Sequence, residues 1–196
     1  MLGSIKYNLR NLANFSGRDA RQTFWYFVLF IAILRWIAGS IIAVPMMIKM
    51  FGTMFSSIKQ GARPETMEAM QGQINGQMVA MMQDMIGVSI AIGVVSGLLL
   101  VAALVRRLHD SDLSGWWAAV PAVLYAAALG MIPAQIHQAA EILQTAGTKP
   151  LNPAAMIQQQ GGIALVAWIP LIMVILIGVR KSTPGPNRFG ESSVSF

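Results

Sequence analysis

The stretch RRLHDSDLSGWW, residues 106–117, decides the fold because it is short and polar and lies between two long apolar runs. The run before it covers residues 86–105, and the run after it covers residues 116–133. Each approaches the roughly 20 residues with which an α-helix crosses a bilayer. The stretch is therefore predicted to be a loop between two membrane spans, and the other segments are placed relative to it.

The composition of the whole chain is typical of a membrane protein. Of its 196 residues, 55% are hydrophobic and 11% are charged, whereas about a quarter of the residues in a soluble domain are charged. The net charge is +6, but the basic residues flank the apolar runs and form no basic face, so no nucleic-acid partner is predicted. The absence of cysteine excludes disulfides and thiolate metal sites within this chain.

Two further apolar runs, residues 24–48 and 162–179, bring the predicted number of transmembrane helices to four. Basic residues near the span ends predict the orientation, because they concentrate on the cytoplasmic side. With the N-terminus on that side, it holds Lys6, Arg10, Arg18, Arg21, Arg106, Arg107, Arg180, Lys181 and Arg188, and the other side holds Lys49, Lys59, Arg63 and Lys149. Because nine basic residues lie on this side and four on the other, both termini and the loop at residues 106–117 are predicted to be cytoplasmic.

The segments outside the spans also have a helical pattern. Apolar residues recur at three- and four-residue steps along residues 51–85 and 134–161, which indicates helical extensions beyond the membrane. Pro64 suits the first turn of such a helix. We predict an all-α integral membrane protein, with one four-helix membrane domain over residues 1–196. Its four transmembrane helices form two antiparallel hairpins with helical tips outside the bilayer.

Three motifs can be read together along this plan: NFSGRDARQTFWYFVLF at residues 14–30, VRRLHDSDLSGWW at residues 105–117 and TPGPNRFGESS at residues 183–193. They closely resemble the bacterial inner-membrane family called domain of unknown function 805, the YhaH-type proteins. In that family FxGRxxRxxFW, RRLHDxxxSGWW and GTPGxNRFG recur in this order. The resemblance implies a four-span protein of the bacterial inner (plasma) membrane with no established activity. One departure is Ser182, where the family has glycine.

The predicted topology places all three motifs on the cytoplasmic face, where we expect a motif cluster. Its residues are Ser16, Gly17, Arg18, Arg21, Arg106, Arg107, His109, Asp110, Ser114, Trp116, Asn187 and Arg188. One interpretation is a self-satisfied network, in which Arg106 pairs with Asp110 one helical turn away and Ser114 caps the third helix. The other is a surface that binds a ligand or a partner, since motif-bearing loops often carry function.

Catalytic and metal sites are not predicted. His109, Asp110 and Ser111 are adjacent in sequence, and three neighbouring residues do not usually converge on one reacting atom. The two histidines, His109 and His137, are predicted to lie on opposite sides of the membrane and cannot share an ion. Methionines along residues 67–85 could bind Cu(I) or could fill helix contacts. No enzyme activity and no cofactor are expected.

Arg35 and a stripe of small residues are the notable features inside the spans. An unpaired cation near mid-bilayer costs at least about 2.5 kcal/mol, so Arg35 should face a polar cavity, helix carbonyls or an acidic residue from another subunit. Alternatively, residues 24–34 lie flatter in the interface and Trp36 marks the true start of the span. Ser89, Gly93 and Gly97 are spaced for close helix packing, within a hairpin or between subunits.

These features lead to three hypotheses for function. The first is a non-enzymatic structural or accessory subunit that docks a membrane-protein partner, or further copies of itself, through the cytoplasmic motif cluster. The second is a small channel or transporter, motivated by Arg35 and by the helix prolines Pro45, Pro121 and Pro170, since bent helices can line a cavity. The third is a protein that binds anionic lipid headgroups through the arginines of the cluster. Membrane lipids are expected neighbours in every case.

Overall fold

The computed structural model describes residues 1–59, 64–145, 168–191 and 193–196. Its helices are α1 (Leu2–Arg10), α2 (Arg21–Lys59), α3 (Pro64–Asp110), the 3-10 helix η1 (Gly115–Ala118), α4 (Ala119–Gly130), α5 (Ile132–Thr145) and a C-terminal helix (Trp168–Val179). Over these ranges every regular element is a helix, which confirms the prediction of an all-α protein, and strand pairing is limited to two isolated β-bridges.

Within the described ranges, three helical stretches are long enough and apolar enough to cross a membrane: Arg21–Ser56, Gly72–Asp110 and Gly115–Ile142. The C-terminal helix is apolar but shorter. The predicted fourth span starts at residue 162 and the predicted second tip reaches residue 161, so both lie partly outside the described residues. The count of four spans therefore stays a prediction.

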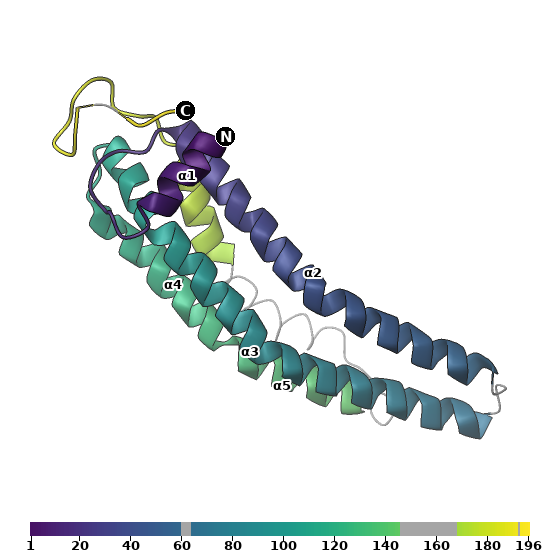
Figure 1. Ribbon diagram of the computed structural model, residues 1–196. Helices are drawn as coiled ribbons and strands as arrows, with labels where there is room; N and C mark the ends of the chain where they lie inside the picture. Colours follow the sequence, from purple (N-terminus) through teal and green to yellow (C-terminus); the bar gives the residue numbers. More distant parts are fainter. Residues whose placement is uncertain (60–63, 146–167, 192) are drawn as a thin grey trace.

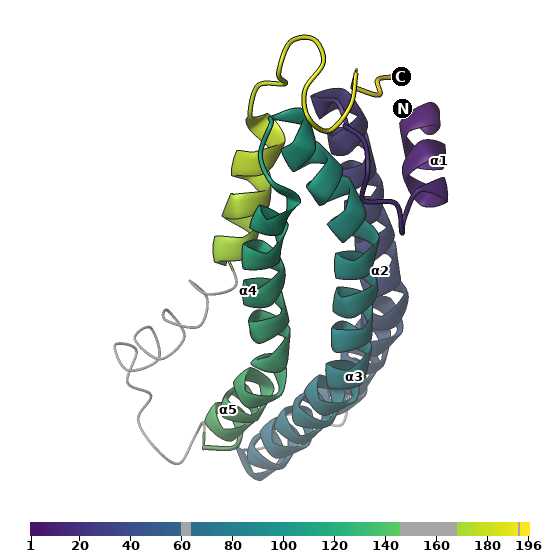
Figure 2. The ribbon, with the colours of Figure 1, turned by 90° about the vertical axis from the view of Figure 1, so that its left-hand side faces the viewer.

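The two long helices α2 and α3 run antiparallel and dominate the shape (Figure 1). Their 39 and 47 residues give lengths of about 58 and 70 Å at 1.5 Å per residue. α3 begins at Pro64, where the missing N–H of proline leaves no broken hydrogen bond. Both chain ends and the connection after α3 lie at one end of the molecule, opposite the tip of the α2–α3 pair (Figures 1 and 2).

The predicted third span is not one uninterrupted helix. Instead η1 and α4 lead to Met131, whose N–H is shared between the carbonyls of Ala127 and Ala128, and α5 starts at the next residue. Pro133 in the first turn of α5 explains the break, because proline lacks an N–H and its ring clashes with the carbonyl four residues earlier.

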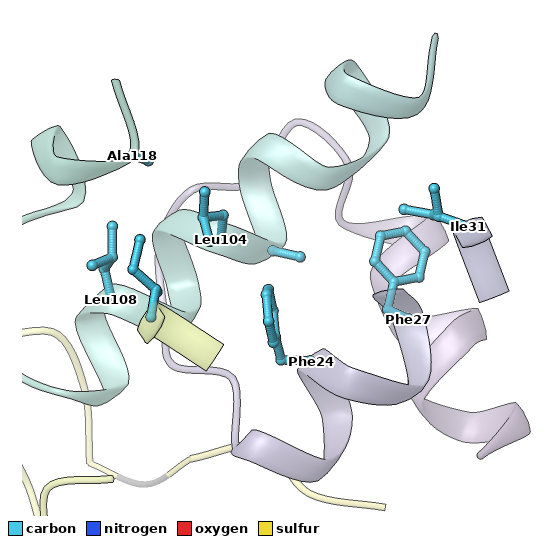
Figure 3. Close-up of a cluster of buried hydrophobic side chains, with 8 residues drawn as sticks. Phe24, Phe27, Ile31, Leu104, Leu108 and Ala118 are labelled. Carbon is cyan, nitrogen blue, oxygen red and sulfur yellow. The ribbon is translucent and has the colours of Figure 1, made fainter. Parts of the chain in front are cut away.

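The hydrophobic core lies at the same end of the molecule as the chain termini. Phe24, Phe27 and Ile31 of α2 pack with Leu104 and Leu108 of α3 (Figure 3). Ala103 of α3, Ala118 of η1 and Ile177 of the C-terminal helix complete this cluster. At Gly178 a Cβ atom would lie 2.7 Å from Trp25 and 2.9 Å from Phe24, so glycine lets the C-terminal helix approach α2 closely.

Beyond this core α2 carries no buried residue from residue 32 to residue 56, although the segment is strongly apolar. α3 contacts α4 and α5 as well as α2. In α3 a Cβ at Gly93 would lie 2.5 Å from Leu129, and one at Gly97 would lie 3.1 Å from Tyr125. Two of the three small residues thus face α4, across the two predicted hairpins, and Ser89 is half-buried on the same helix.

The methionines of α3 whose side chains are described, Met78, Met81, Met82 and Met85, are half-buried on the helix that contacts α5. The side chains of Met67 and Met70 lie outside the described residues. In the part of the chain that the structure describes, no three His, Asp or Glu side chains gather closely enough to hold a metal ion.

Candidate functional site

Three arginines of the motif cluster, Arg18, Arg106 and Arg107, are at most 1% exposed. Arg18 belongs to the loop between α1 and α2, and the other two lie in the last turn and a half of α3. Burying a guanidinium group is costly unless its N–H groups find acceptors. The partners of each arginine therefore define what this site does.

Arg18 is enclosed by the C-terminal tail. Its Nε donates to Oδ1 of Asp110 at 3.3 Å, and its NH2 lies 3.3 Å from the same oxygen. NH1 donates to the carbonyls of Gly185 at 2.6 Å and Gly190 at 3.2 Å, and NH2 donates to that of Thr183 at 2.7 Å. Gly185 and Gly190 have positive φ angles, a backbone conformation that favours glycine. The motif glycines thus shape the tail around this cation.

Arg106 holds the N-terminal segment. Its NH2 donates to the side-chain oxygen of Asn8 at 2.6 Å, and its NH1 donates to the carbonyls of Asn11 at 2.8 Å and Asn14 at 2.5 Å. Its Nε forms an ion pair with Asp19 at 3.0 Å. The predicted pairing of Arg106 with Asp110 is therefore wrong. The side chain points away from Asp110 because four acceptors from the N-terminal segment surround it.

Arg107 makes the pair with Asp110 instead, from three residues away, at 2.5 Å between NH1 and Oδ2. Its Nε donates to the carbonyl of Gly178 at 3.2 Å, and its NH2 donates to that of Arg180. These carbonyls belong to the end of the C-terminal helix, where the helix dipole favours a cation. Arg107 thereby ties α3 to the C-terminal helix.

Asp110 is the acceptor at the centre of the motif cluster. Besides the two arginines, the hydroxyls of Ser182 and Ser193 donate to its carboxylate, the former at 2.5 Å. Its backbone carbonyl accepts from the N–H of Thr183 at 2.8 Å. Ser182 replaces the glycine of the resembling family, so this chain adds a hydroxyl donor at that point. Asp110 is 0% exposed, so its carboxylate has no open side for a substrate.

His109 lies against the tail as well. Its ring stacks on Phe189 with centroids 3.9 Å apart, and its Nδ1 lies 3.3 Å from the carbonyl of Gly17. The side chain of Asn187 donates to the backbone carbonyl of His109 at 2.9 Å. Gly17 has a φ of 93°, which favours glycine at this motif position. A carbonyl and an aromatic ring, with no carboxylate among the described contacts, surround His109.

Other motif residues lie at the surface. Ser114 caps η1 by accepting from the N–H of Trp116 at 3.4 Å. The Trp116 side chain is 83% exposed. Arg188 forms an exposed ion pair with Asp112 at 3.2 Å. Ser16 and Arg21 are exposed too, so the structure separates the predicted residues into a buried network and a surface group.

The predicted cluster lacked several residues of the network, among them Asn8, Asp19, Ser182, Ser193 and Val194. Val194 exchanges backbone hydrogen bonds with residues 18–20 and accepts from the hydroxyl of Thr23 at 2.7 Å. Burial raises the pKa of the Asp19 carboxyl, although Arg106 acts in the opposite direction. Asp19 directly follows Arg18, and this position beside a cation could have identified it as part of an ion-pair network. Val194 lies just past the last motif, and nothing in the sequence indicated its role.

Arg35 has a partner within the chain. Its NH1 donates to the hydroxyl of Tyr125 at 3.0 Å, and this hydroxyl donates to the carbonyl of Gly93 at 3.1 Å. The bonds connect α2, α4 and α3. Because α2 runs without interruption from Arg21 to Lys59, residues 24–34 and Trp36 belong to one helix.

The network described above coincides with the motifs of a known family. A family model described as "Protein of unknown function (DUF805)" matches residues 12–191. The chain belongs to the DUF805 family. Comparisons with curated proteins and with solved structures found no match. In this DUF805 protein the buried motif arginines use their donors on carbonyls and carboxylates of distant segments, and they thereby hold the N-terminal loop, the end of α3 and the tail together.

Proposed function

We propose that this DUF805 protein is a non-enzymatic accessory subunit of the bacterial inner membrane, with four spans and both termini in the cytoplasm, that binds a membrane-protein partner. The observation that carries the proposal is the exposed apolar surface of α2. From residue 32 to residue 56 no residue of this helix is buried. Lipid can cover such a surface inside the bilayer, but only there.

The length of α2 supports a protein contact in addition to lipid. The helix is about 58 Å long, whereas the hydrocarbon core is about 30 Å thick. With the predicted span at residues 24–48, the side chains of Phe51, Met54 and Phe55 lie beyond that core and are 45–66% exposed. A row of large apolar side chains outside lipid marks a protein contact. We infer that the partner packs on this outer part of α2.

The motif cluster supports this function indirectly. Its buried arginines have no free surface, so a partner cannot touch them. They fix the relative positions of three segments and so present the exposed members Arg21, Trp116 and Arg188 on a rigid frame. Docking at the cytoplasmic face would use these surface residues.

Native mass spectrometry of the protein extracted gently from its own membrane tests the proposal. We expect the wild type to carry a stoichiometric protein partner or further copies of itself. Phe51→Glu with Phe55→Glu is expected to release it, because charged side chains cannot pack against an apolar partner. Gln73→Glu with Gln77→Glu adds the same charge at exposed polar positions of α3 and should keep the partner bound. Monomer alone in the wild type, or equal loss in both double variants, would exclude docking on α2.

The channel or transporter hypothesis has less support. It rested on Arg35, an unexplained charge in the first span, and Tyr125 now gives that charge a polar partner. Flux in liposomes that disappears in Arg35→Ala and persists in Tyr125→Phe would favour transport over the accessory role.

A further inference from the structure

α1 has an inverted arrangement of polar and apolar side chains. The side chains that it buries are polar, Ser4 and Asn8, at 0% and 1% exposure. Leu2 is 80% exposed and Leu9 is 42% exposed. A helix at a water-facing surface shows the opposite pattern, with its apolar stripe toward the protein. The outer face of α1 is therefore suited to an apolar environment.

The inversion is fixed by the buried network. Asn8 accepts from Arg106 at 2.6 Å through its side-chain oxygen and donates to the carbonyl of Ser4 at 3.0 Å. On the same helix, the ring of Tyr7 lies 5.5 Å from the Arg106 guanidinium and 5.7 Å from the ring of Phe196. Turning the leucines inward would leave Arg106 without its Asn8 acceptor. The orientation of α1 thus follows from the motif arginine.

Unpaired cations lie on α1, at the start of α2 and just after the C-terminal helix. They are Lys6, Arg10, Arg21, Arg180 and Lys181, which together we term the cationic surface. All five are exposed, and no ion pair involves them in the ranges that the structure covers.

The aspartates at this end of the molecule do not neutralise the cationic surface. Asp19 and Asp110 are buried and paired with arginines, and Asp112 pairs with Arg188. η1, which carries the exposed Trp116 and Trp117, follows the end of α3 at the same end of the molecule (Figure 2). Tryptophan side chains at this level are typical of the membrane–water interface.

We propose that α1 lies in the interface of an anionic leaflet and that the cationic surface binds the phosphates of anionic phospholipids. Leu2 and Leu9 insert at the boundary between headgroups and acyl chains, and Lys6 and Arg10 beside them contact the headgroups. Helices that bind membranes in this way combine exposed apolar residues with flanking cations. The lipid ligands are these exposed residues, and the buried arginines only orient α1.

The depth of α1 is measured with spin labels, for which the cysteine-free chain is suited. A label at Leu9→Cys in vesicles of phosphatidylglycerol and phosphatidylcholine should be accessible to oxygen and protected from an aqueous nickel chelate. The control label at Glu191→Cys, in the exposed tail, should be accessible to the chelate. Equal access of the chelate to both labels would show that α1 lies in water, and the proposal would be overturned.

Headgroup selectivity is measured by native mass spectrometry of the purified protein titrated with phosphatidylglycerol. Lys6→Gln and Arg10→Gln should each weaken binding about fivefold, since one cation near an anionic surface contributes about that factor. Lys49→Gln, an equal charge loss beyond the first predicted span, should leave it unchanged. Equal affinity for phosphatidylcholine, or no loss in the α1 variants, would overturn the proposal. Purified protein and lipid suffice, so this result does not depend on the accessory role.

Discussion

Asp110 illustrates how much one residue stabilises this structure. Two buried guanidinium groups and two serine hydroxyls share its carboxylate. Asp110→Asn removes the counter-charge of both arginines, and breaking a buried pair typically costs about 3–5 kcal/mol. We expect a loss of that size in the free energy of unfolding in detergent. Asp112→Asn removes an exposed carboxylate from its pair with Arg188 and should cost at most about 1 kcal/mol.

Comparing Asp110→Asn with Asp112→Asn separates the effect of burial on stability from the effect of losing one charge. Both remove one carboxylate, and only the Asp110 carboxylate lies inside the network. Similar losses in the two variants would show that the network does not hold the segments together.

Asp19 gives the network a pH dependence. Burial raises the pKa of its carboxyl above the ordinary value of 3.8. Because ionisation is harder in the folded chain than in the unfolded one, the stability that Asp19 contributes is greatest below pH 3.8 and falls as the pH rises through the raised pKa. Asp19→Asn does not titrate, and its side-chain oxygen can still accept from Arg106.

Unfolding midpoints of the wild type and of Asp19→Asn, measured in detergent over a pH series, test this behaviour. The wild type should lose stability relative to the variant as the pH rises above 3.8, and the difference should level off above the raised pKa. A difference that instead grows in favour of the wild type would mean that the ion pair with Arg106 outweighs the burial of Asp19.

The sequence identified the three buried arginines and Asp110 but not their pairing. Helical spacing offers Asp110 a partner three or four residues earlier, and Arg106 and Arg107 satisfy both spacings. The choice depends on α1 and the loop after it, which surround Arg106 with Asn8, Asn11 and Asn14. The sequence did not indicate that α1 binds Arg106. A polar helix face is usually predicted to face water, and in α1 the polar face is the buried one.

At the level of helices, the close approach of α3 and α4 depends on glycine. A Cβ at Gly93 would lie 2.5 Å from Leu129, so Gly93→Ala forces a shift in well-packed side chains and should cost about 1–3 kcal/mol. At Gly87, on the same helix, a Cβ meets open space. Gly87→Ala should therefore raise the free energy of unfolding by about 0.5–1 kcal/mol, the helix preference of alanine over glycine.

The two Gly→Ala changes on α3 are therefore expected to change the free energy of unfolding in opposite directions. They are measured as unfolding free energies in the same detergent. A gain in stability from Gly93→Ala would mean that α4 does not approach α3 closely at this point.

The helices were predictable to different degrees. α2 and α3 follow a sustained apolar period, and Pro64 marks where α3 begins. The break at Met131 depends on where Pro133 falls relative to the carbonyl of Leu129, which hydropathy does not report. The spacing of Gly93 and Gly97 predicts close packing against some helix but does not say which one. Predicting their contact with α4 would have required knowing which helices are neighbours.

At the scale of the whole molecule, the network constrains how often the chain crosses the membrane. Asp110, at the end of α3, is bonded to Arg18 before α2 and to Ser182 in the tail. Segments bonded in this way lie on one side of the bilayer. We therefore expect an even number of crossings between Arg18 and Asp110, and again between Asp110 and Ser182. α2 and α3 are long and apolar enough to supply the first pair, and the stretch Gly115–Ile142 is long and apolar enough for one crossing of the second.

The predicted fourth span, residues 162–179, would be the return crossing, and only its last part, Trp168–Val179, lies within the described residues, so four spans stay a prediction. Single cysteines in the cysteine-free chain test this count through labelling by a membrane-impermeant maleimide. Ala13→Cys and Ser195→Cys, both at exposed positions, should react only after the inner membrane is permeabilised, because the distribution of basic residues predicts that both termini are cytoplasmic. Gln77→Cys, at an exposed position on the outer part of α3, should react in intact spheroplasts. Labels at positions 13 and 195 on opposite sides would require an odd number of crossings, which a tail bonded to Asp110 and Arg18 cannot make.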